Sequence, residues 1–64
     1  SQEMWEQIVS ELFAVTEETL ITVGTEPEAR IIREWGEGMG RTVEISENPA
    51  DPIYDIWVCR SKKA

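Results

Sequence analysis

The chain has 64 residues, which is room for a single domain. Its formal net charge is −7, and it contains one cysteine and no histidine. The charge argues against general nucleic-acid or membrane binding, the lone Cys59 excludes an internal disulfide, and the missing histidine disfavours a zinc site. We therefore expect a non-catalytic domain without metal or cofactor, stabilised by apolar packing that includes Trp5, Trp35 and Trp57.

The negative charge is confined to the first half of the chain. Residues 1–29 contain seven acidic residues and no basic one, whereas residues 30–64 contain six of each. This asymmetry fits a solvated helix face, or a docking surface for a basic protein partner that would use Glu3, Glu6 and Glu11. An unpaired cysteine, with no signal peptide and no long apolar run, favours a soluble cytoplasmic protein.

The first predicted element is a helix from about Gln2 to Ala14. Its apolar residues recur at helical spacing and form one stripe: Trp5, Ile8, Val9, Leu12 and Phe13. A strand is predicted from Thr19 to Gly24, because the segment is rich in β-branched residues and ends at a glycine. Both of its faces are fairly apolar, which predicts an interior strand.

A second helix is predicted from Thr25 to about Glu37. Thr25 and Glu28 have the spacing of a capping box, and Pro27 suits the first helical turn. The apolar stripe of this helix contains Ile31, Ile32, Trp35 and Met39, with Glu28 on the same side. Three glycines at positions 36, 38 and 40 are predicted to end the helix, with Gly40 as the C-cap candidate.

Two alternating segments predict the remaining strands, Arg41–Ser46 and Ile53–Arg60. Between them, Glu47–Pro52 is predicted to be a turn that two prolines restrict. Residues 61–64 are predicted to be a frayed basic tail. The expected fold class is α+β: a two-layer sandwich of order α-β-α-β-β. Its two helices pack on one face of a three-stranded sheet, which includes a C-terminal antiparallel hairpin.

Two groups of residues are candidates for chemistry or binding. Cys59 has Arg60 and Lys62 nearby, which would lower the pKa of a reactive thiol, although a cysteine at a strand end is more often inert. Arg30, Arg33 and Arg41 are predicted to cluster around the second helix and its exit. They would contact an anion or a protein partner, or form weak ion pairs with neighbouring glutamates.

The stretch from Glu18 to Lys63 resembles the bacterial sulfur-carrier family of TusA or SirA-like proteins. The similarity lies in the strand Glu18–Val23, the helix start Glu26-Pro27-Glu28-Ala29 and the last-strand segment Tyr54–Val58. That family opens with a strand and a Cys-Pro-x-Pro motif whose cysteine carries sulfur. This sequence has neither feature, and Cys59 does not match the motif. The resemblance therefore implies a related fold without the family's active cysteine.

A weaker resemblance links the chain to the single-stranded nucleic-acid-binding domains named for an Arg-x-x-x-His signature. Arg30 would stand for the arginine, but the residue four places on is Glu34.

Three functions follow as hypotheses. The first is a protein-interaction domain resembling a sulfur carrier without its active cysteine. The second is a sulfur-relay protein that uses Cys59, and the third is a nucleic-acid binder. A sheet without the family's first strand would also have an open edge, at which a second copy of the chain could pair.

Overall fold

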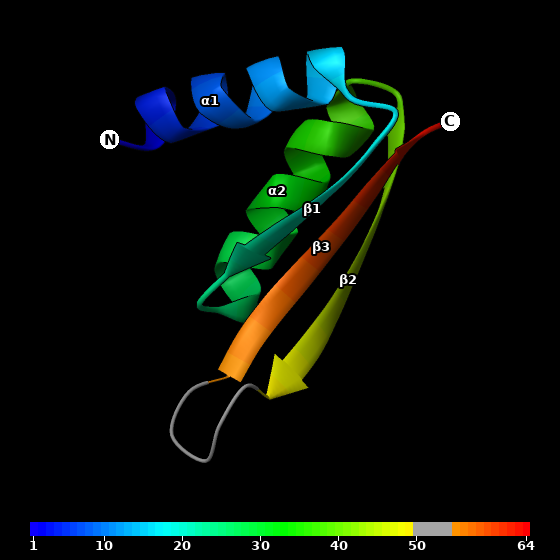
Figure 1. Cartoon of the computed structure of the whole chain (residues 1–64). Helices are drawn as coiled ribbons and strands as arrows, with labels where there is room; N and C mark the ends of the chain where they lie inside the picture. The colour runs from blue at the N-terminus through cyan, green and yellow to red at the C-terminus, as the bar shows by residue number, and fades with distance from the viewer. Residues whose placement is uncertain (50–54) are drawn as a thin grey trace.

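The computed structural model of the chain describes residues 1–49 and 55–64. Its elements follow in the order α1 (Gln2–Val15), β1 (Glu18–Val23), α2 (Glu26–Gly38), β2 (Arg41–Pro49) and β3 (Asp55–Lys63) (Figure 1). The strands form one antiparallel sheet, against which the helices pack. This two-layer arrangement confirms the predicted α+β class and element order.

The strand order in the sheet is β1-β3-β2, so the last strand of the chain is the central one. The antiparallel pairing predicted for the last two strands is confirmed by the register from Arg41 opposite Lys63 to Pro49 opposite Asp55. The interior position predicted for the strand at residues 19–24 is wrong, because β1 lies at an edge of the sheet. Leu20, whose apolarity led to that prediction, is 50% exposed on the outer face of the sheet.

The predicted ends of the last two strands also need correction. β2 continues through Glu47 to Pro49, where a turn was expected, and β3 runs to Lys63, where a frayed tail was expected. Lys62 pairs with both Glu18 and Thr42, because β3 has a strand on each side to accept its backbone hydrogen bonds. The rest of the predicted turn and the predicted strand start at Ile53 lie outside the described residues.

One hydrophobic core joins the helices to the inner face of the sheet. Side chains on that face alternate with outward-facing ones along each strand, so Ile21, Cys59 and Ile45 lie side by side across the three strands. Trp35 and Trp57 are partly buried against this core. The buried apolar residues of the core are Val9, Phe13, Ile21, Val23, Ala29, Ile32, Val43 and Cys59.

Local signals at both ends of α2 position it on the sheet. Thr25 is the N-cap, and its hydroxyl oxygen accepts a hydrogen bond from the backbone N–H of Glu28 at 3.3 Å. The same hydroxyl donates to the Glu28 carboxylate at 2.8 Å. Thr25 and Glu28 therefore interact as their spacing predicted, but the carboxylate bonds the hydroxyl and not the backbone N–H of Thr25, as a full capping box requires. At the other end, Met39 is the C-cap, one residue before the predicted Gly40. Gly40 follows it with a φ of 78°, the left-handed conformation that favours glycine after a helix.

Candidate functional site

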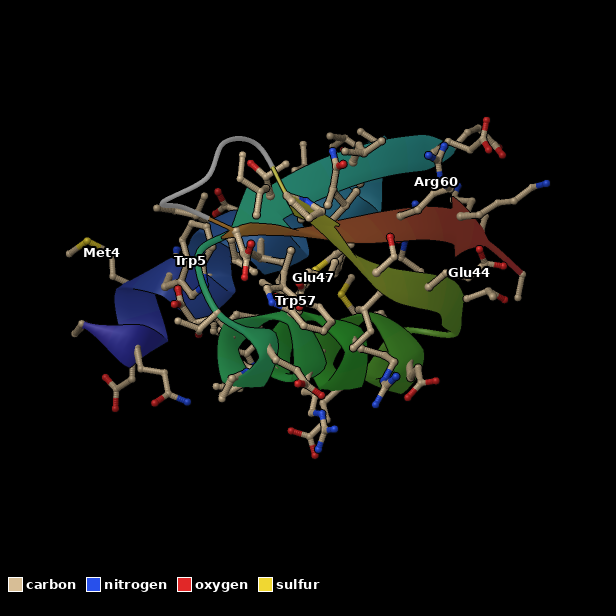
Figure 2. The ribbon with its side chains drawn as sticks, turned by 90° about the horizontal axis from the view of Figure 1, so that it is seen from below. Met4, Trp5, Glu44, Glu47, Trp57 and Arg60 are labelled. Carbon is tan, nitrogen blue, oxygen red and sulfur yellow. The ribbon has the colours of Figure 1, made fainter. Side chains whose placement is uncertain are left out.

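The apolar stripe of α1 is wider than the area that the rest of the fold covers. Val9 and Phe13 are buried in the core with 1% exposure each. Trp5 and Ile8, which belong to the same predicted stripe, are 39% and 53% exposed, and the neighbouring Met4 is 63% exposed. Figure 2 shows Met4 pointing away from the fold at the free end of α1, with Trp5 beside it. Two of the five residues of the predicted core stripe are therefore available to a partner.

A groove of about 300 Å³ lies between the start of α1 and the side of α2 that carries Glu28, Ile31 and Trp35. Trp5 borders it on the side of α1, and Ile31 and Trp35 border it on the side of α2. Ser1, Gln2 and Glu28 complete its lining. The exposed apolar side chains of α1 and this groove adjoin at Trp5. We call them together the α1–α2 surface, and its apolar members are Met4, Trp5, Ile8, Ile31 and Trp35.

Acidic residues border this surface unevenly. With about 100° of rotation per helical residue, Glu11 lies on α1 beside Met4 and Ile8, whereas Glu3 and Glu6 lie further around the helix. Glu11 and Glu3 are exposed and Glu6 is half-buried. Glu28 contributes a further carboxylate from α2. The three glutamates predicted as one partner site are thus spread around α1. Glu11 lies beside Met4 and Ile8, and Glu28 lines the groove.

The three arginines predicted as a cluster do not share a surface. Arg30 is exposed, and its guanidinium donates to the Glu26 carboxylate one helical turn earlier at 2.5 Å. Arg33 is half-buried on α2. Arg41 is only 6% exposed, so the prediction that it contacts a partner is wrong.

The guanidinium group of Arg41 instead connects the end of α1 to the sheet. It donates to the backbone carbonyls of Phe13 and Thr16 at 2.8 Å each and of Glu17 at 3.0 Å. Its Nε donates to the hydroxyl of Ser61, which is fully buried, at 2.6 Å. Carbonyls at a helix C-terminus lack partners within the helix and carry partial negative charge, so they stabilise this buried cation.

Cys59 is fully buried, and its Sγ lies 3.8 Å from the carbonyl oxygen of Ala29, to which the thiol donates. Burial raises the pKa of the Cys59 thiol, while the positive charge of Arg33 lowers it to a smaller extent. A nucleophilic cysteine needs an exposed sulfur with a lowered pKa. Cys59 has neither property in this fold, which favours the inert alternative.

The outer face of the sheet carries paired charges. Glu18 lies opposite Lys62, and Arg60 lies between Leu20 and Glu44 on the neighbouring strands. Figure 2 labels Arg60 and Glu44 on β3 and β2. A shallow depression of about 170 Å³ lies among four of these charged residues and Thr42. Because acidic and basic groups alternate across the strands, this face presents no surface of a single charge.

Within residues 1–49 and 55–64, no group of three histidine, cysteine or acidic residues is arranged to hold a metal ion. No described helix has the length and apolarity that are needed to cross a membrane. The fold and surface thus define an α+β domain whose most distinctive feature is the α1–α2 surface. Comparisons with protein-family models, curated proteins and solved structures give no match to this chain.

Sequence reasoning missed Met4 and did not separate Ile31 from the buried Ile32. The signal for Met4 was its position four residues before Ile8, which places both on one side of α1. Ile31 and Ile32 both fit an apolar helical stripe. Which of them enters the core depends on the angle at which α2 crosses the sheet, and periodicity alone does not specify that angle.

Proposed function

We propose that this chain is a small protein-interaction domain that binds a basic amphipathic helix at the α1–α2 surface. The observation that carries the proposal is the exposure of Trp5, Ile8 and Met4 beside an apolar groove. Helices commonly bind such grooves through apolar side chains spaced at i, i+3, i+4 and i+7. Methionine and tryptophan suit this role, since one adapts its shape and the other offers a large contact area.

Charge complementarity supports a basic partner. No lysine or arginine occurs in residues 1–29, so the only formal side-chain charges on α1 are those of Glu3, Glu6 and Glu11. On α2, Glu28 borders the groove, and the nearby Arg30 is paired with Glu26. Lysine or arginine residues flanking the apolar face of a bound helix would meet carboxylates near Trp5 and Ile8. Such contacts chiefly raise the association rate and select against acidic partners.

The proposal agrees with the resemblance to a sulfur carrier that lacks its active cysteine. The alternative relay function for Cys59 requires an accessible thiol, and Cys59 is fully buried. The nucleic-acid alternative relies on Arg30, Arg33 and the basic C-terminal residues. Arg30 is paired with Glu26, while Arg60 and Lys62 lie opposite Glu44 and Glu18, and a phosphate backbone requires a surface with excess positive charge.

A fluorescein-labelled leucine–lysine amphipathic helical peptide tests the proposal by anisotropy titration. We expect the wild-type chain to bind it with an affinity that falls as salt increases. Ile8→Ser should weaken binding about tenfold, equivalent to roughly 1.4 kcal/mol, because it removes an apolar contact at an exposed site. The matched control is Leu20→Ser, which changes a side chain of similar exposure on the outer face of the sheet and should leave the affinity unchanged.

A leucine–glutamate peptide of the same length serves as the charge control. Equal binding of both peptides would contradict the need for a basic partner. An equal loss of affinity in Ile8→Ser and Leu20→Ser would show that the α1–α2 surface is not the binding site.

A further inference from the structure

The hydrogen-bond pattern of the sheet shows which backbone groups of β2 are unpaired. The N–H of Lys63 donates to the carbonyl of Glu17 at 2.9 Å, so this pair is a hydrogen-bonded one. Hydrogen-bonded pairs alternate along an antiparallel ladder. The backbone groups of Cys59 and Ser61 on β3 therefore bond to β1, and those of the intervening residues bond to β2. On β2 the residues bonded to β3 are then Thr42, Glu44, Ser46 and Asn48. The backbone groups of Val43, Ile45 and Glu47 point to the free edge.

The β2 edge carries only some of the devices that prevent strand pairing, namely the charges of Glu44 and Glu47 and the terminal Pro49. Its register with β3 runs from Arg41 to Pro49 without a bulge, and the strand contains no lysine. Pro49, the last residue of β2, belongs to the residues whose backbone groups point to the free edge. Its missing N–H therefore breaks no hydrogen bond to β3. Figure 1 shows β2 at the margin of the sheet with no described element on its outer side. β1, the other edge strand, is three residues shorter.

We propose that two copies of this chain pair antiparallel along their β2 edges, with Ile45 on the two-fold axis. This register overlaps the full length of both strands and forms about six backbone hydrogen bonds through Val43, Ile45 and Glu47. Ile45 is half-buried within one copy, and Ile45 of the second copy would cover its remaining exposed part. The result is one continuous six-stranded sheet with the helices of both copies on the same face.

Side-chain chemistry favours this register over those centred on Glu44 and on Val43. A two-fold axis at Glu44 would place two carboxylates directly opposite each other at a close, non-bonded pair. An axis at Val43 would leave Pro49 overhanging and would run the partner strand into the turn at Met39 and Gly40. With the axis at Ile45, Glu44 lies opposite Ser46 of the second copy, whose hydroxyl can donate to the carboxylate.

Sedimentation velocity over a concentration series tests the dimer. We expect a species of twice the 7.3 kDa chain mass as concentration rises. Chemical synthesis of the full chain with an N-methyl group on the backbone nitrogen of Ile45 should abolish this species, since it blocks an outward N–H without breaking a bond to β3. N-methylation of Leu20, whose N–H faces outward on β1, is the matched control and should leave the dimer intact. A chain that stays monomeric at millimolar concentration, or a dimer insensitive to methylation at Ile45, would overturn the proposal.

Disulfide trapping tests the register. Two single variants, Glu44→Cys and Ser46→Cys, are mixed and oxidised, while the buried Cys59 stays inaccessible. The Ile45-centred register predicts a mixed disulfide between the two variants and little cross-linking of either alone. Rapid cross-linking of Glu44→Cys alone or of Ser46→Cys alone would place the axis at that residue and overturn the register.

Discussion

Gly36 lies inside α2 and faces the core, although the sequence predicted that it would help to end the helix. A β-carbon at this position would stand 2.5 Å from Cγ2 of Val43 and 3.3 Å from Cε2 of Phe13. The missing side chain therefore lets α2 approach β2 and α1 closely. A β-carbon placed on Gly38, two residues further along, would have no neighbouring atom within 4 Å.

Substitution of these two glycines should have opposite effects on stability. Gly36→Ala should lower the free energy of unfolding by about 1–3 kcal/mol, because the added methyl group forces the core apart. Gly38→Ala should raise it by up to about 1 kcal/mol, since alanine is the better helix former and meets no neighbour. Urea denaturation followed by circular dichroism measures both. Equal stability of the two variants would contradict the close packing at Gly36.

Burial of the Cys59 thiol makes stability depend on pH in the alkaline range. The pKa of Cys59 is raised in the folded chain, so the folded state retains the thiol proton to higher pH than the unfolded state does. The free energy that the neutral thiol contributes to folding is therefore fully present below the ordinary thiol pKa. It is lost as pH rises through the raised pKa of the folded state.

We expect the free energy of unfolding to fall more steeply above about pH 9 in the wild-type chain than in Cys59→Val, by up to about 1.4 kcal/mol per pH unit. Valine approximates the size of cysteine and does not titrate. The pH dependence that remains in Cys59→Val therefore measures the contribution of the other groups that titrate at alkaline pH. Urea titrations at several pH values provide the measurement. Parallel pH curves for the two proteins would show that the thiol does not contribute.

Between elements, Arg41 joins the end of α1 to the middle of the sheet through four hydrogen bonds. The guanidinium carbon also lies 5.1 Å from the centre of the Phe13 ring, a favourable position for a cation above an aromatic face. No carboxylate is among these partners. The geometry needs a planar group with several N–H donors, which lysine does not provide.

Arg41→Met should therefore lower the free energy of unfolding by about 2–4 kcal/mol, because buried carbonyls lose their donors. Arg30→Met is the matched control, since Arg30 forms an exposed ion pair that is worth about 0–1 kcal/mol. Thermal and urea unfolding of both variants test this difference. If both variants lose the same small amount, the network around Arg41 does not stabilise the junction.

The helices and strands were largely predictable because their signals are local. Thr25, Pro27 and Gly40 mark the limits of α2 within a few residues of sequence, and alternation reveals β2. Residues 61–63 gave no such signal. They form strand because β1 and β2 lie on either side of them, and that environment depends on distant parts of the chain.

At the level of the whole molecule, the sequence did not predict the strand order or the exposure of Trp5 and Ile8 in the α1 stripe. Leu20 made β1 look interior, yet its neighbour across the strands is Arg60 on a solvent-facing surface. The apolar pattern of α1 predicted one buried side, but not how little of the helix a 64-residue domain could cover. The proposed interaction surface includes the apolar part of α1 that the fold leaves exposed.

The central position of β3 has a consequence for how the chain acquires its structure during synthesis. β1 and β2 pair with β3 and not with each other, so neither has a sheet partner until residues 55–63 have left the ribosome. A nascent chain can form helices earlier, because helical hydrogen bonds are local, but its sheet must await residues 55–63. We therefore expect the sheet to form in one step once residues 55–63 are available, rather than progressively from β1.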